Sequence, residues 1–140
     1  MAVRAVRGAT QVRLDDREHV LALTRELVAE VLATNDLAAD DLISMLFTAT
    51  PDLTSVAPAL AARQLGLHDV ALICVQEMAV TGSMPRVIRL LAHVETDRSG
   101  PEIQNVYLRG TQVLRADVPP IPADPDPIRS DPAAPSTMES

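Results

Sequence analysis

The segment Leu72–Arg89 carries three side chains of different chemistry within one short stretch. Cys74 offers a thiol, Glu77 a carboxylate and Arg89 a guanidinium. They lie at the edges of two apolar runs, joined by a Val-Thr-Gly turn, that are predicted to be buried β-strands. Burying such groups costs free energy unless each has a partner, or a ligand supplies one. The segment therefore predicts the functional site of this chain.

Every cationic site in this protein must be built from arginine, because all 12 basic residues are arginine and lysine is absent. The planar guanidinium matches a carboxylate and does not lose its proton. Further candidates are Arg7 at the end of the first predicted strand, Arg63 on a short helix and Arg115 in the last β-type run. Taken singly, Arg7 and Arg63 are also explained as solvated surface residues. The only tyrosine is Tyr107, and a lone tyrosine in a strand is more often a core residue with a hydrogen-bonded hydroxyl than a site residue.

Composition excludes several classes of protein. The formal charge of −7 and the pI of about 4.8 argue against nucleic acid as a partner, since phosphate binding requires a basic surface. A single cysteine cannot form an internal disulfide, which favours the reducing cytoplasm. The N-terminal MAVRAVRGAT lacks the apolar stretch of a signal peptide, and no apolar run approaches the length of a membrane span. We therefore expect a cytoplasmic protein that does not enter a membrane.

The elements that must position these residues follow from hydrophobic periodicity. Strands are predicted at Ala2–Ala9, Leu42–Ala49, Val70–Val75, Val87–Thr96 and Ile103–Leu108, with Thr111–Arg115 as a final β-type run. A long helix is predicted from a cap at Asp15 or Asp16 to about Thr34, where Asn35 stops it, and a short helix at Val56–Leu65. This pattern indicates an α+β (mixed α/β) fold with a sheet of about five strands. One long and one short helix cannot cover both faces of such a sheet, so we expect the chain to complete its core by oligomerising.

The C-terminal segment differs from the rest of the chain in composition. Seven of the 11 prolines fall in the last 25 residues, among Asp, Ser and Ala. Such a segment cannot bury enough apolar surface to offset the entropy of ordering it. We therefore predict a folded domain over residues 1–117 and a proline-rich, disordered tail over residues 118–140.

Six short motifs occur in collinear order between Met1 and about Asp117. They are VRGAT at Val6–Thr10, ATPDL at Ala49–Leu53, CVQEMAVTG at Cys74–Gly82, IR at Ile88–Arg89, VYL at Val106–Leu108 and VLRADV at Val113–Val118. In these motifs and their spacing the chain resembles the monofunctional chorismate mutases of the trimeric pseudo-α/β-barrel class. Each motif is weak alone, whereas six in order form a strong signal.

The resemblance implies a homotrimer with interfacial sites that converts chorismate to prephenate in phenylalanine and tyrosine biosynthesis. The reaction is an intramolecular Claisen rearrangement, which requires no covalent intermediate, metal or proton transfer, so no cofactor is expected. The protein must hold the substrate in a folded conformer and stabilise the charges that separate in the transition state.

The resemblance also implies roles for the candidate residues. Arg89 points at the ether oxygen, where negative charge grows, and Glu77 accepts a hydrogen bond from the ring hydroxyl near the developing positive charge. Cys74 hydrogen-bonds the same hydroxyl. Arg7 and Tyr107 are implied to bind a carboxylate of the substrate. The residues implied to line the pocket are Ile73, Val75 and Gln76, and Arg63 and Arg115 are implied to lie toward its mouth.

Three positions depart from the family pattern. Ala57 stands where a phenylalanine is expected, Leu60 where a lysine is expected and Ile73 where a threonine is expected. The first two positions lie near the implied pocket mouth. These departures therefore concern substrate affinity more than the chemical step.

Two other functions remain open on the sequence. One is a different trimeric enzyme of similar architecture, such as an imine or enamine deaminase, which also uses interfacial arginines. The other is a non-catalytic trimer that binds a metabolite of the aromatic pathway. The motif at Cys74–Gly82 does not suggest a deaminase, and mere binding does not need an arginine aimed at the ether oxygen.

Overall fold

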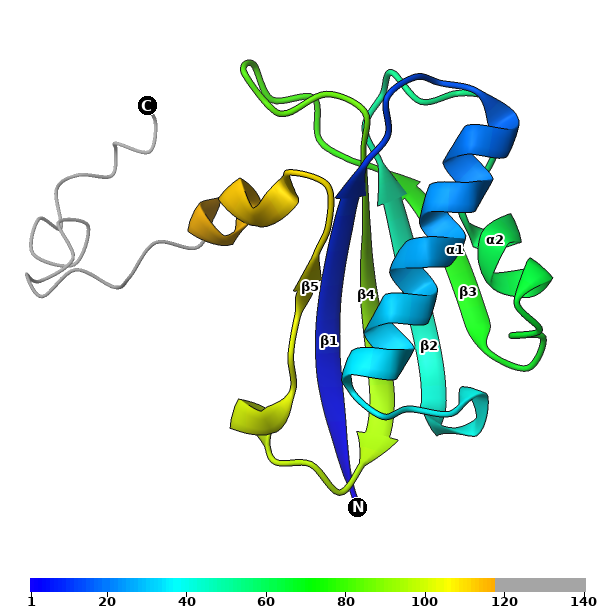
Figure 1. Ribbon diagram of the computed structural model, residues 1–140, viewed down its shortest axis with the longest axis vertical. Helices are drawn as coiled ribbons and strands as arrows, with labels where there is room; N and C mark the ends of the chain where they lie inside the picture. The colour runs from blue at the N-terminus through cyan, green and yellow to red at the C-terminus, as the bar shows by residue number, and fades with distance from the viewer. Residues whose placement is uncertain (118–140) are drawn as a thin grey trace, which may run out of the picture.

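A computed structural model describes residues 1–117 of the chain, and within them the strands form one mixed sheet of five (Figure 1). The strands are β1 (Ala2–Gln11), β2 (Leu42–Ala49), β3 (Ala71–Gln76), β4 (Val87–Thr96) and β5 (Val106–Tyr107). Their order across the sheet is β3-β2-β4-β1-β5. β4 is antiparallel to both β1 and β2, whereas β5 is parallel to β1 and β3 is parallel to β2. The predicted fold class is confirmed.

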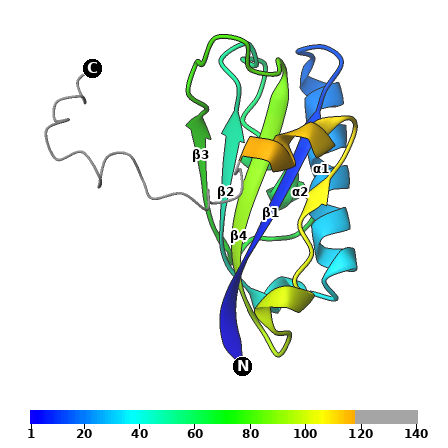
Figure 2. The ribbon, with the colours of Figure 1, turned by 90° about the vertical axis from the view of Figure 1, so that its left-hand side faces the viewer.

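Two α-helices of the described residues, α1 (Arg17–Thr34) and α2 (Ala59–Gln64), lie on the same side of the sheet (Figures 1 and 2). α1 begins at the predicted cap, where the Asp16 carboxylate accepts a hydrogen bond from the backbone of His19, and it ends at Asn35. Gly8 lets α1 approach β1 closely, because a Cβ atom there would lie 3.1 Å from Leu27 and Val31. The main core is thus packed between α1, α2 and one face of the sheet.

The opposite face of the sheet, which we call the open face, has no helix layer within residues 1–117 except at one end. There the 3₁₀ helix η3 (Thr111–Asp117) packs Leu114 against Ala9 and Val87. Elsewhere the open face exposes apolar side chains, with 58% of Val3, 54% of Ile73 and 43% of Val75 accessible. Ile73 and Val75 lie on the same face of β3, so they form an exposed apolar strip at the edge of the sheet.

The structure corrects two predictions about elements. Residues Thr111–Arg115 belong to a 3₁₀ helix rather than a β-type run, because Arg109 and Gly110 both have positive φ and turn the chain away from the sheet. The strand predicted at Val70–Val75 is not buried in the single chain. It forms β3 at the edge of the sheet, with most of its residues exposed.

Other elements differ from the predictions only in their limits. β1 is longer than predicted and β5 much shorter, whereas β2 and β4 have the predicted bounds. α2 begins three residues later than predicted, after Pro58. No helix within residues 1–117 is long and apolar enough to cross a membrane. The predicted disordered tail lies outside the described residues.

Candidate active site

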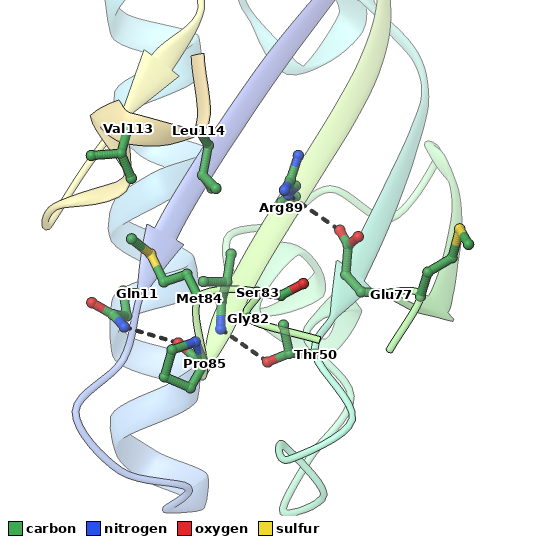
Figure 3. Close-up of a pocket in the computed structure, with 12 residues that line it drawn as sticks. Gln11, Thr50, Glu77, Gly82, Ser83, Met84, Pro85, Arg89, Val113 and Leu114 are labelled. Carbon is green, nitrogen blue, oxygen red and sulfur yellow. Dashed lines mark hydrogen bonds and ion pairs between the residues drawn. The ribbon is translucent and has the colours of Figure 1, made fainter. Parts of the chain in front are cut away.

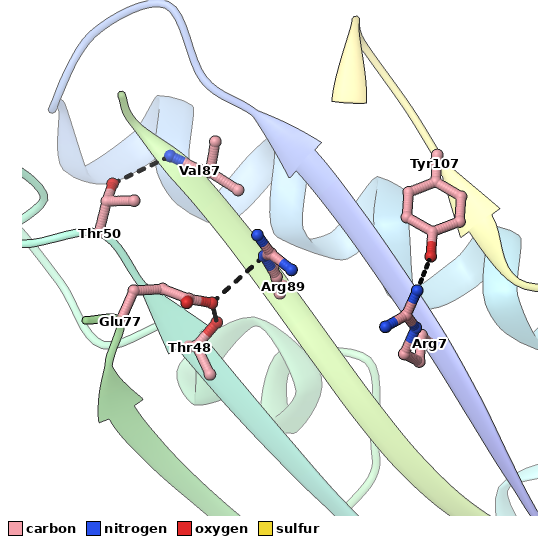
Figure 4. Close-up of polar contacts among 7 residues, drawn as sticks. All are labelled: Arg7, Thr48, Thr50, Glu77, Val87, Arg89 and Tyr107. Atoms are coloured by element: carbon pink, nitrogen blue, oxygen red, sulfur yellow. Dashed lines mark hydrogen bonds and ion pairs between the residues drawn. The ribbon is translucent and has the colours of Figure 1, made fainter. Parts of the chain in front are cut away.

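Glu77 and Arg89 form an ion pair on the open face of the sheet (Figure 4). The Arg89 Nε atom lies 3.3 Å from the Glu77 Oε2 atom, and both side chains are half-buried, with 33% of Arg89 and 24% of Glu77 accessible. The Thr48 hydroxyl donates a hydrogen bond to the same Oε2 atom. Two charges of opposite sign are therefore held side by side in a fixed arrangement.

The strand register explains why these residues meet. Arg89 of β4 pairs directly with Thr48 of β2, which pairs in turn with Val75 of β3. Glu77 follows the end of β3, where its backbone N–H donates to the Ala49 carbonyl at 2.9 Å. Side chains two residues apart on a strand lie on the same face, so Val75, Glu77, Thr48 and Arg89 all reach the open face.

The ion pair lines a pocket of about 640 Å³ (Figure 3). Its other walls come from the end of β1, the residue that follows β2, the loop between β3 and β4, the start of β4, and η3. They are formed by Gln11, Thr50, Met78, Gly82, Ser83, Met84, Pro85, Val87, Val113 and Leu114. A charged pair in a partly apolar pocket acts more strongly on a ligand than the same pair in water, because the local dielectric constant is lower.

Arg7 and Tyr107 form another contact on the neighbouring strands. The Arg7 Nη2 atom donates to the Tyr107 hydroxyl at 2.6 Å (Figure 4). The guanidinium carbons of Arg7 and Arg115 lie 6.0 and 5.9 Å from the centroid of the tyrosine ring. Arg89 of β4 pairs with Ala9 of β1, and Arg7 lies two residues before Ala9. The Cα atoms of such diagonal neighbours are roughly 7–8 Å apart. Two guanidiniums thus approach one region of the open face.

The turn that follows Tyr107 is anchored on α1. The Arg109 guanidinium donates two hydrogen bonds to the Glu26 carboxylate, at 2.9 and 2.8 Å, and this pairing lowers the pKa of Glu26. The Thr111 hydroxyl contacts the carbonyl oxygens of Ala9 and Leu108 at 3.1 and 2.7 Å. These contacts fix the direction in which the chain leaves β5 and place η3 over the pocket.

The remaining predicted residues lie elsewhere. Cys74, Val75 and Gln76 line a separate pocket of about 290 Å³ beside the loop that includes Ala57. Cys74 faces the helix layer, where its Sγ atom accepts a hydrogen bond from the Ala59 backbone at 3.3 Å. Ile73 lies exposed on the open face, and Arg63 lies exposed on α2.

The single chain therefore brings together only part of the predicted site. β3 and β1 are three strand spacings apart, or roughly 14 Å. Arg7 and Tyr107 lie at one side of the sheet, whereas Arg63 and the residues Ile73–Gln76 lie at the other. The side chains of Glu77 and Arg89 meet between these groups.

The loop beside the smaller pocket is held by a carboxylate. Asp15 accepts hydrogen bonds from the backbone of Thr54, the hydroxyl of Thr54 and the backbone of Ser55, at 2.9, 3.1 and 3.1 Å. A side-chain hydrogen bond from Ser55 and the backbone bond from Thr54 are the main reasons that the pKa of Asp15 is lowered to about 2. This clamp joins the loop after β1 to the loop between β2 and α2.

The Asp15 clamp predicts a specific dependence of stability on pH. A carboxyl whose pKa is lowered by folding stabilises the protein above its unfolded pKa of roughly 3.9, and this contribution is lost as the pH falls through the folded value. Asp15→Asn should therefore be less stable than wild type at pH 7, and the difference should shrink as the pH falls from about 4 toward 2. Urea unfolding at several pH values measures the difference in the free energy of unfolding between variant and wild type. Asp69→Asn, a substitution at an exposed site, is the control. A difference that stays constant down to the lowest pH would contradict this account.

Sequence reasoning missed Thr48 and the apolar pocket residues Met84 and Leu114. Thr48 follows the apolar residues of β2 and carries no local signal of a role in the site. Its partner Glu77 is 29 residues away, so only the pairing of β2 with β3 identifies it.

Two opposite charges held side by side can stabilise opposite charges that develop within one substrate. Comparison with known proteins identifies the class of the protein, because the family model for chorismate mutase type I matches residues 3–118. The chain belongs to the type I chorismate mutase family.

Individual relatives agree with this assignment. The chain is 41% identical to the chorismate mutase AroH of Bacillus subtilis (strain 168) over 84% of its own length and 94% of that protein. It is 44% identical to the chorismate mutase AroH of Thermus thermophilus over 83% of its length and 96% of that protein. A solved chorismate mutase from Clostridium thermocellum superimposes with a TM-score of 0.77 at 42% identity, covering 78% of this chain and 97% of the other.

The family predicted from the six motifs is thereby confirmed, and with it the prediction that the chain is an enzyme, an isomerase. These matches favour neither alternative function, the imine or enamine deaminase or the non-catalytic trimer. The roles of the single residues, the trimeric state and the cytoplasmic location stay predictions.

Proposed function

We propose that this mutase converts chorismate to prephenate with Arg89 and Glu77 as the charge-stabilising pair. The observation that carries the proposal is the ion pair between them, held in a pocket on the open face. In the rearrangement the ether carbon–oxygen bond breaks while a carbon–carbon bond forms within the same molecule. Negative charge develops on the enolpyruvyl oxygen and positive charge develops on the ring.

Arg89 and Glu77 match these two charges. A guanidinium aimed at the ether oxygen stabilises it most in the transition state, where its negative charge is largest. The Glu77 carboxylate accepts a hydrogen bond from the ring hydroxyl and lies near the positive ring. The Thr48–Glu77–Arg89 contacts hold the two charged groups in place relative to each other, and charges that are held in place need little reorganisation during the reaction.

Arg7 and Tyr107 are proposed to bind a substrate carboxylate. Their hydrogen bond holds the guanidinium in place, and Arg115 approaches the same ring from η3. A planar guanidinium can donate two parallel hydrogen bonds to a carboxylate. Since that carboxylate is charged before and during the reaction, this contact serves binding more than rate.

We further propose that the active enzyme is a homotrimer with its sites between subunits. Two observations support this: the apolar open face that residues 1–117 leave without a helix layer, and the division of the predicted site across the sheet. If the β3 edge of one subunit docks on the open face of the next, its pocket lining meets the neighbour's Arg7 and Arg89. Arg63 on α2 would then approach the same substrate. We place this assembly in the cytoplasm on the basis of the single cysteine, and we expect it to need no cofactor.

The direct test is to incubate purified protein with chorismate and to measure its loss together with prephenate formation. We expect chorismate to be lost at the same rate as prephenate is formed. We also expect the active species to have the mass of a trimer in light scattering. Binding of chorismate without conversion would indicate the metabolite-binding trimer. Release of ammonia from imine or enamine substrates, without chorismate conversion, would indicate the deaminase.

Cys74 is proposed to act by hydrogen bonding and not as a nucleophile. Its thiol accepts from the Ala59 backbone at the start of α2, and a serine hydroxyl can accept the same bond. Cys74→Ser should therefore keep kcat/KM within about threefold of wild type, since less than one hydrogen bond is lost. Steady-state kinetics check this, with Cys74→Val, which removes the acceptor, as the comparison. Complete loss of activity in Cys74→Ser, or a covalent adduct seen by mass spectrometry, would require another mechanism.

A further inference from the structure

Thr48 occupies the central position between the two charged residues of the site. It lies on β2, opposite Arg89 of β4 on one side and opposite Val75 of β3 on the other. Its hydroxyl donates to the Glu77 Oε2 atom, the same atom that lies 3.3 Å from the Arg89 Nε atom (Figure 4). The side chain is half-buried on the open face.

We propose that Thr48 is a positioning residue, which holds the Glu77 carboxylate in the orientation that the rearrangement needs. Both observed contacts use Oε2, so the carboxylate is fixed with Oε1 as the oxygen left to meet the ring hydroxyl of the substrate. This inference rests on the role proposed above for Glu77.

The physical basis is the freedom of a glutamate side chain. Glu77 lies just beyond the end of β3, with three rotatable side-chain bonds, and an ion pair with one arginine does not by itself fix the plane of the carboxylate. A β-branched threonine on a strand has a restricted χ1 angle, so its hydroxyl is a rigid donor. A hydrogen bond to a charged acceptor is also stronger than one between neutral groups.

The test compares Thr48→Val with Thr48→Ser. Valine keeps the shape of threonine and removes the donor, whereas serine keeps the donor. Thr48→Val should lower kcat by about 10- to 100-fold, the range for one hydrogen bond to a charged group, with KM within about twofold of wild type. Thr48→Ser should recover kcat to within about threefold of wild type, because the hydroxyl is restored.

Two controls separate positioning from a general effect on folding. Thr10→Val makes the same change on the opposite face, at a buried Thr10 hydroxyl that has no hydrogen-bond partner among the described residues, and should leave kcat unchanged. In a Glu77→Ala background, Thr48→Val should change kcat by less than about twofold, since the carboxylate it positions is already gone. Equal losses in both backgrounds, or a Thr48→Ser variant as slow as Thr48→Val, would overturn the inference.

A crystal structure of Thr48→Val tests the same point without any assay. The expected result is a Glu77 side chain that has left the position seen in the wild type, whereas an unchanged Glu77 rotamer would overturn the proposed role of Thr48. If instead the wild type does not convert chorismate, the proposed function fails, and the rotamer comparison still decides whether Thr48 orients Glu77.

Discussion

Arg89→Ala should lower kcat by at least about 10²–10³, the effect of removing one well-placed oxyanion donor, which corresponds to about 2.7–4 kcal/mol. The loss should appear mainly in kcat, because the ether oxygen gains its charge only in the transition state. The structure adds a further reason for a large effect. Removing the guanidinium leaves the Glu77 carboxylate in the pocket without its cationic neighbour, so a negative charge remains near the oxygen that becomes negative.

The conservative variant and a matched control sharpen this prediction. Arg89→Lys should recover only part of the activity, since an ammonium group cannot span the ether oxygen and a carboxylate in one plane. Arg17→Ala removes an exposed guanidinium from α1, in the other layer of the fold, and should leave kcat and KM unchanged. Steady-state kinetics with chorismate measure all three variants. Normal kcat with a raised KM in Arg89→Ala would mean that Arg89 only binds substrate.

Leu46→Asp should make the subunit monomeric at assay concentrations and thereby remove more than about 99% of the activity, a factor that corresponds to ~2.8 kcal/mol or more. Leu46 lies in the middle of the open face, where the sheet register places it between Leu91 of β4 and Ile73 of β3. In the single chain the side chain is only half-buried, so an aspartate there remains hydrated and the subunit still folds. In an interface the same carboxylate would lose its water, which costs several kcal/mol per ion.

Light scattering and activity over a range of protein concentrations test this prediction together. Wild type should have the mass of a trimer, and Leu46→Asp that of a monomer with the circular dichroism of a folded chain. Activity per subunit in Leu46→Asp should rise with concentration as mass action restores the assembly. Leu65→Asp places the same charge at the end of α2, where 41% of the leucine is exposed, and should remain an active trimer. A fully active monomer of either variant would show that the site does not need a neighbouring subunit.

Local patterns predicted the helix boundaries of α1 and the bounds of β2 and β4 correctly. The Asp16 cap and the Asn35 stop are local signals, because each side chain bonds backbone groups within four residues. The alternation of apolar and polar residues, and runs of apolar residues, likewise predict strands β2 and β4. The apolar pattern predicted the wrong element at Thr111–Arg115. There the positive φ of Arg109 turns the chain away from the sheet, and an arginine gives no local signal of a positive φ.

The amino-acid sequence alone is enough to name the groups that can do the chemistry. They are an arginine-only set of cations and one carboxylate in an apolar segment, together with the motifs that contain them. The sequence could not show on which strands of the sheet, and on which face, these groups lie. That depends on strand order and register, which are set by pairings between segments far apart in the chain. The tertiary structure places β3 at an edge, Thr48 between Glu77 and Arg89, and Cys74 on the helix side. The open face and the divided site follow from that order, because the helix layer of residues 1–117 covers one face of the sheet only.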